Sequence, residues 1–93
     1  MRQIIETIIM GIKRGNMFDS HYVIDKVIRD FSDDYLRFAA ANIASGKVTE
    51  YAHSELAKII SSFERTLVEQ QASKSISFNI RGNSSECSLW RRI

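Results

Sequence analysis

Three side chains in this sequence could act as nucleophiles or metal ligands: Cys87, His21 and His53. None stands at the spacing of a known site, because the chain contains no CxxC, no HExxH and no closely paired histidines. We interpret Cys87, two positions before Leu89 in an expected strand, as a buried structural thiol. His53 is interpreted as a polar surface residue rather than a ligand, and His21 as a neutral ring in the first turn of a helix.

Paired carboxylates and phosphate loops are the other patterns that would indicate catalysis. Asp33 and Asp34 are adjacent on an expected helix, so their side chains diverge and cannot easily share a substrate. They are better explained as partners of the helix dipole. The four glycines stand apart from one another, so no glycine-rich phosphate loop is present. We therefore expect no enzymatic activity, no cofactor and no metal site.

The elements that would position these residues are mainly helical. Apolar residues at helical spacing predict helices over about 3–14, 19–31, 33–44 and 50–65. We expect Asp19, Ser32 and Thr49 to cap three of them, and Gly15 and Gly46 to end the first and third. In the fourth, Phe63 continues the apolar face, which predicts that its ring is buried in the core.

The first helix carries an unusually wide apolar face. Five isoleucines share it: Ile4, Ile5, Ile8, Ile9 and Ile12. Part of this face must pack on the chain's own helices. The remainder favours a homodimer, because a surplus of exposed apolar surface is a liability for a monomer. The competing interpretation is that the whole helix is internal, and the sequence leaves both open.

After the helices, the apolar residues recur at every second position. Residues 75–81 alternate polar and apolar side chains, which predicts a half-buried strand. A turn cluster at 81–85 and a partner strand at 87–92 complete a hairpin. A weaker strand candidate covers 66–71, separated from the hairpin by a short link at 72–74. Trp90 is interpreted either as a cover for one end of the core or as an exposed aromatic beside Arg91 and Arg92.

Together these elements predict one α+β domain over residues 1–93: a bundle of three to four helices followed by a β-hairpin at about 75–92. This order resembles that of a winged helix-turn-helix domain. The resemblance is most specific over residues 59–69, where MarR-like regulators show a large apolar residue, an acidic residue, basic residues, glycine and then Leu-Val. The matching positions are Phe63, Glu64, Arg65, Leu67 and Val68, and Thr66 stands where glycine is usual.

The resemblance implies a function in binding double-stranded DNA and regulating transcription. The helix at 50–65 would lie in the major groove, and the turn at 81–85 would be the wing tip. Arg81 would enter a minor groove or contact phosphate, with Lys58 and Arg65 adding attraction to phosphate. The implied DNA-binding residues are Thr49, His53, Ser54, Lys58, Ser61, Ser62, Arg65, Arg81 and Asn83.

Charge leaves a second function open. The net charge is +2, with basic ends and an acidic middle, and Glu50, Glu55, Glu64 and Glu69 lie on the fourth helix and its exit. A protein-interaction domain of the same fold is therefore the alternative, and a structural or assembly subunit of a phage or mobile element is a third. A continuous positive face joining the fourth helix to Arg81 would favour DNA, and a mixed face would favour a protein partner.

Hydropathy places the chain away from the membrane. The longest apolar stretch, at 4–12, contains Glu6 and is far shorter than the roughly 20 residues that a membrane span needs. A single cysteine excludes a disulfide framework within the chain. We therefore expect a cytoplasmic protein with no membrane partner.

Overall fold

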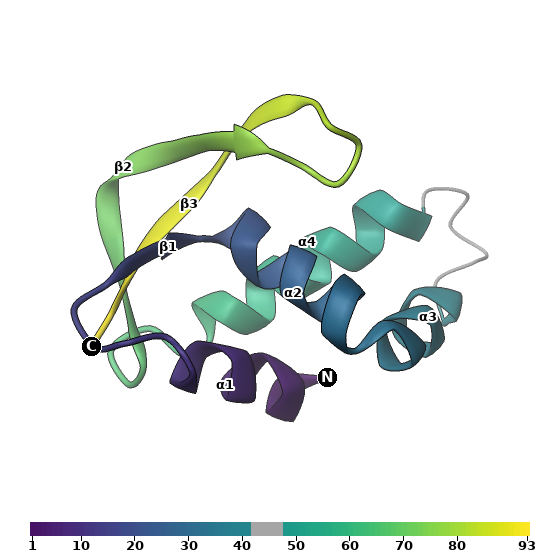
Figure 1. Ribbon diagram of the computed structural model, residues 1–93, viewed down its shortest axis with the longest axis horizontal. Helices are drawn as coiled ribbons and strands as arrows, with labels where there is room; N and C mark the ends of the chain where they lie inside the picture. The colour runs from purple at the N-terminus through teal and green to yellow at the C-terminus, as the bar shows by residue number, and fades with distance from the viewer. Residues whose placement is uncertain (42–47) are drawn as a thin grey trace.

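Helices come first in this chain and the two long strands last (Figure 1). The computed structural model describes residues 1–41 and 48–93, without the side chains of Val48 and Thr49. Within this part of the chain, the helices are α1 (Arg2–Met10), α2 (Ser20–Asp30), α3 (Ser32–Ala40) and α4 (Val48–Ser61). The strands are β1 (Met17–Asp19), β2 (Val68–Phe78) and β3 (Ser84–Arg92), in an antiparallel sheet of order β1-β3-β2. The expected α+β class is confirmed.

The hairpin of β2 and β3 bends over α2 and α4, while α1 lies on the opposite side of these helices (Figure 1). The core fills the space between the helices and the base of the sheet. Its fully buried side chains include Ile5, Ile9, Val23, Val27, Leu56, Ile60 and Val68. None of the helices in the described residues is long and apolar enough to cross a membrane.

The isoleucines of α1 pack inside the chain. Ile5 and Ile9 are fully buried, and Ile4, Ile8 and Ile12 are partly buried against the same core. The surplus of apolar surface that favoured a homodimer is therefore taken up internally. The helix ends at Met10 rather than near residue 14. Its last turn tightens there, because the Gly11 N–H is shared between the carbonyls of Thr7 and Ile8 and the Ile12 N–H donates to the carbonyl of Ile9.

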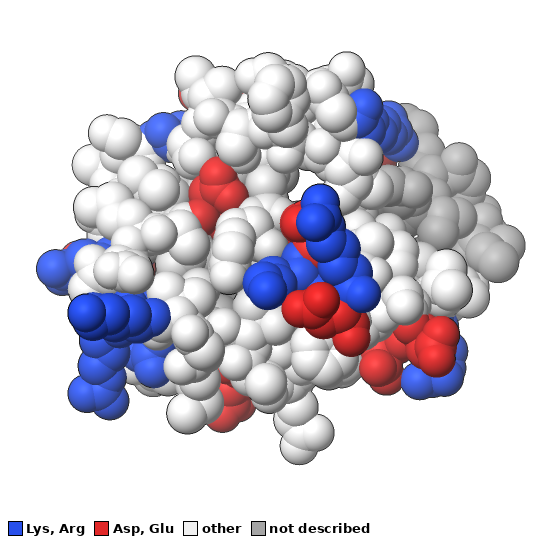
Figure 2. Space-filling view, in the orientation of Figure 1, with Lys and Arg blue, Asp and Glu red and all other residues white. Residues whose placement is uncertain are grey.

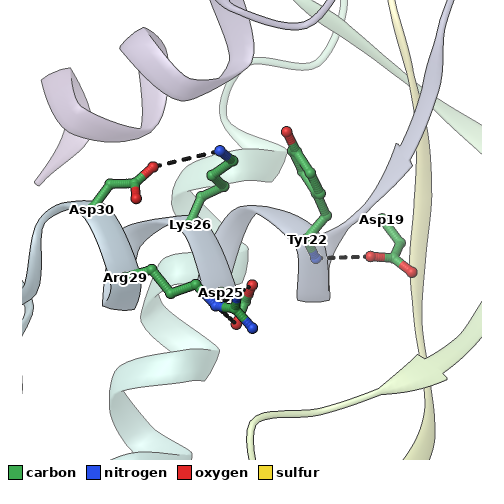
Figure 3. A network of polar contacts seen from close by, with 6 residues as sticks. All are labelled: Asp19, Tyr22, Asp25, Lys26, Arg29 and Asp30. Atoms are coloured by element: carbon green, nitrogen blue, oxygen red, sulfur yellow. Dashed lines mark hydrogen bonds and ion pairs between the residues drawn. The ribbon is translucent and has the colours of Figure 1, made fainter.

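The predicted cap of α2 is confirmed. Asp19 is the N-cap, and its Oδ1 accepts a hydrogen bond of 2.8 Å from the Tyr22 N–H (Figure 3). The outer face of α2 carries ion pairs between Asp25 and Arg29 and between Lys26 and Asp30. These pairs are exposed and contribute little stability.

The predicted cap of α3 is wrong. Ser32 is the first helical residue, and Phe31 takes the N-cap position without a side-chain hydrogen bond. The reason is that only Phe31 separates α2 from α3. Its N–H donates to the carbonyl of Val27 to close α2, and its own carbonyl accepts from Tyr35 in α3. The Thr49 cap and the Gly46 stop lie outside the described residues.

The burial of Phe63 is confirmed, although the helix ends earlier than predicted. α4 stops at Ser61, and Phe63 follows in a turn with its ring 4% exposed. Arg65 has a φ of +70°, which a helix cannot contain, and its N–H donates to the carbonyl of Val68 at 2.8 Å. The left-handed residue at this junction is thus Arg65, one position before the expected glycine position at Thr66.

The strands differ from the prediction in two ways. The expected link at 72–74 is part of β2, because a register shift between Gln70 and Lys74 accommodates the extra residues without ending the strand. β1 was not predicted, since three residues are too few to show an alternating pattern. The hairpin turn covers 79–83 rather than the predicted 81–85, because the Asn79 side chain accepts from two backbone N–H groups and Gly82 takes a φ of +76°.

Trp90 belongs to the core. It is 2% exposed, and its Nε1 donates to Ser20 Oγ at 3.1 Å, so the interpretation as an exposed aromatic is wrong. Arg92, two residues on, is also buried and donates from Nε to the carbonyl of Ile9 at 3.1 Å. β3 therefore joins the sheet to both α2 and the end of α1.

Candidate functional site

A cleft of about 980 Å³ opens between α2, α4 and the hairpin. Its lining includes both histidines of the chain and its cysteine, together with Asp19, Glu50 and Arg81. The residues that carry chemistry thus meet in one place, although their spacing in the sequence gave no indication of it.

The serines of β2 turn toward the polar start of α2, and the cleft there is lined by Ser77 together with Phe78 and Ile80. Ser75 and Ser77 are partly buried, whereas Ile76 and Phe78 between and after them are 72% and 73% exposed. The strand alternates as predicted, but the buried side is the polar one. The reason is that this part of β2 lies over the polar N-terminus of α2, where Ser75 Oγ donates to Asp19 Oδ2 at 2.7 Å.

The His21 side chain, which comes from α2, contacts both strands of the hairpin. Its Nδ1 is 2.7 Å from Ser77 Oγ and its Nε2 is 3.3 Å from Ser85 Oγ. Ser77 and Ser85 are directly opposite each other in the β2–β3 pairing, and Ser75 is opposite Cys87. The interpretation of Cys87 as a buried thiol is only partly right, because it is of intermediate exposure and lines the cleft.

The surroundings of Asp19 favour its ionised form. Burial by itself would raise the pKa of its carboxyl group. The hydrogen bonds from Ser75, the Tyr22 N–H and Ser77, with the nearby His21 ring, outweigh that effect and lower the pKa below its ordinary value. This side chain therefore has two tasks: it caps α2 and presents a negative charge at the edge of the cleft.

His53 occupies the other wall of the cleft. Its Nε2 is 2.9 Å from the hydroxyl oxygen of Tyr35, which joins α4 to α3. Burial lowers the pKa of His53, and the nearby Arg81 guanidinium and His21 ring lower it further. Burial likewise raises the pKa of Tyr35. Both shifts favour a neutral imidazole hydrogen-bonded to a neutral phenol.

Acidification should destabilise the fold through His53. Below its unfolded-state pKa of about 6.5, the unfolded chain binds a proton that the folded chain binds less readily, so stability falls as the pH falls. The loss should end once the pH is below the lower pKa of the folded state. Urea unfolding at a series of pH values measures this, and His53→Gln should remove this part of the pH dependence. Equal pH profiles for the two proteins would contradict it.

The structure brings some of the implied DNA-binding residues into the cleft and leaves others outside it. His53 is half-buried, whereas Ser54, Lys58, Ser61, Ser62, Arg65, Arg81 and Asn83 are exposed, and the side chain of Thr49 lies outside the described residues. Only His53, Ser54 and Arg81 line the cleft. Lys58 pairs with Glu55 at 3.1 Å, and Arg81 lies 3.8 Å from Glu50.

Sequence reasoning missed an exposed apolar row along the hairpin. It consists of Ile76, Phe78 and Ile80, of which Ile80 is 45% exposed. Within the described residues, β2 lies at an edge of the sheet and pairs with β3 alone among the strands. The alternating pattern was visible in the sequence, but it predicts two unlike faces without saying which one packs.

Comparison of this chain with family models, curated proteins and solved structures finds no match.

Proposed function

We propose that this chain is a cytoplasmic, winged-helix-like domain that binds a partner protein through its C-terminal hairpin. The apolar row of Ile76, Phe78 and Ile80 carries the proposal. Helices followed by an antiparallel hairpin are the order that a winged-helix domain has, and in such a domain this hairpin would be the wing. The partner would present an extended apolar segment.

Exposure of the apolar row supports a protein partner. Large apolar side chains at adjacent outward positions of a strand are costly on a free surface and are typical of interaction sites. An edge strand also offers unpaired backbone groups to an added strand. Ile76 and Phe78 of β2 therefore combine exposed apolar side chains with a position on an edge strand. A bound strand would gain main-chain hydrogen bonds and would cover the apolar side chains.

The distribution of charge supports the same choice. Figure 2 shows Lys and Arg side chains lying directly against Asp and Glu over the position of α2. On α4 and the hairpin tip, the ion pairs Glu55–Lys58 and Glu50–Arg81 also mix the two signs. A phosphate backbone is attracted by a continuous positive surface. A mixed surface favours a protein partner.

A photo-crosslinker at the apolar row should capture the partner in intact cells. With p-benzoylphenylalanine in place of Phe78, we expect one discrete protein adduct. The same group in place of Leu36, which is 63% exposed on α3, should give none. Adding Ile76→Thr and Ile80→Thr should abolish the adduct while changing the free energy of unfolding by no more than about 0.5 kcal/mol, as expected for surface positions.

Three outcomes would contradict this proposal. Equal adducts at positions 78 and 36, or none at either, would mean that the apolar row is not a binding surface. An adduct with a second copy of this chain would mean that β2 mediates self-association and does not bind a different partner protein.

DNA binding is the second candidate, favoured by exposed cations and hydroxyls at the end of α4. Lys58, Ser61, Ser62 and Arg65 are all exposed, and no ion pair to Arg65 is found among the described residues. A gel-shift with random duplex DNA at low salt tests it. Retardation that is lost in Lys58→Ala and Arg65→Ala would overturn the protein-partner proposal in favour of DNA.

A further inference from the structure

Asp19, His21 and Cys87 bring three different metal-binding groups together. One carboxylate oxygen, one ring nitrogen and the thiol sulfur all lie within 4.8 Å of one another. They come from the end of β1, the first turn of α2 and the middle of β3. Cys87 therefore meets residues that precede it by 66 and 68 positions in the sequence. All three residues line the cleft.

The chemistry of the donor set matches zinc. Zn²⁺ binds thiolate, imidazole and carboxylate at about 2.0–2.3 Å in tetrahedral geometry, which places its ligand atoms roughly 3.3–3.8 Å apart. The separations of up to 4.8 Å thus need to shorten by about 1 Å, which is within reach of small side-chain rotations. Hard cations such as Mg²⁺ prefer oxygen ligands and would not use the thiol or the imidazole.

The surrounding hydrogen bonds are those that orient metal ligands. Ser75 Oγ donates to one oxygen of Asp19, whose carboxylate keeps further lone pairs. Each nitrogen of His21 faces a serine hydroxyl, Ser77 on one side and Ser85 on the other. One ring nitrogen can therefore bind an ion while the other donates its N–H to a serine, an arrangement that fixes the tautomer and the ring orientation.

We propose that this cluster is a Zn²⁺ site in which Asp19, His21 and Cys87 supply three ligands and the cleft supplies water as the fourth. Three protein ligands and an open position distinguish such a site from a closed structural one. The inference does not depend on the proposed function, because the apolar row supplies none of the ligands, although Phe78 and Ile80 line the same cleft. It also replaces the expectation from sequence that the chain holds no metal.

Titration of the full, untagged and chelator-treated chain with Co²⁺ and Zn²⁺ tests the site. Co²⁺ should bind with one-to-one stoichiometry and give an intense thiolate-to-metal absorption band in the near ultraviolet with tetrahedral d–d bands. Zn²⁺ should displace it and raise the melting temperature. Cys87→Ser should remove the thiolate band, and His21→Gln should weaken binding by about 100-fold or more.

Two further variants separate ligation from folding. Asp19→Asn keeps an N-cap for α2, since asparagine caps as well as aspartate, but removes the charged ligand and should also weaken binding. Ser75→Ala should reduce affinity by about 10-fold to 100-fold, as is usual for groups that orient a ligand. His53→Gln is the matched control, because His53 lines the same cleft outside the cluster, and it should bind as the unaltered chain does.

Failure of the proposal would be equally clear. Absence of saturable Zn²⁺ uptake by the folded chain would overturn it. So would a Co²⁺ spectrum without a thiolate band, binding unchanged in Cys87→Ser, or the same loss of binding in His53→Gln as in His21→Gln. None of these results would alter the crosslinking expected at position 78.

Discussion

Replacing Phe63 by alanine should lower the free energy of unfolding by about 3–5 kcal/mol. The ring is 4% exposed and belongs to the core cluster at the point where α4 gives way to β2. Its loss would leave a cavity beside Ile60 and Val68, both fully buried. It would also remove the ring under the Arg2 guanidinium, whose carbon lies 4.2 Å from the ring centre. A domain of this size has little stability to spare, so much of the variant could be unfolded in water.

Phe78→Ala is the matched control for this measurement. The substitution removes the same atoms, but the Phe78 side chain is 73% exposed in the absence of a partner. Urea unfolding of the two variants should therefore give a large loss for Phe63 and a change within about 0.5 kcal/mol for Phe78. Equal losses at both positions would mean that the placement of either α4 or the hairpin is incorrect.

Trp90→Ala should have a comparable effect, with a loss of about 3–5 kcal/mol. Trp90 is 2% exposed on β3, the central strand, where it lies opposite Phe18 of β1 and opposite Gln70 of β2. Truncation would open a cavity where the sheet meets α2. It would also leave the Ser20 hydroxyl, which is buried, without the indole N–H that donates to it.

Trp90→Phe separates the two contributions. The phenyl ring keeps most of the apolar volume but has no N–H for Ser20, so we expect a smaller loss of about 1–3 kcal/mol, the cost of an unsatisfied buried polar group. Denaturant unfolding with backbone circular dichroism measures both variants. If Trp90→Ala changed stability by less than Trp90→Phe, the indole would not be a core residue.

The sequence by itself determined the helices and much of the core. Isoleucines at helical spacing predicted α1, and Ile5 and Ile9 are indeed its fully buried residues. The Asp19 cap and the burial of Phe63 were also predictable, because both follow from contacts within a few turns of the chain. Ser32 failed as a cap because α2 and α3 share Phe31, a constraint that cap preferences do not include.

The tertiary structure alone decided which side of the hairpin is exposed and what the cleft contains. A period of two divides Ser75, Ile76, Ser77 and Phe78 between two faces, but burial depends on what lies beneath the strand. Here that is the polar start of α2, so the serines turn inward and the apolar row outward. Asp19 and His21 meet Cys87 only because β3 crosses α2, and such long-range pairings have no local pattern in the sequence.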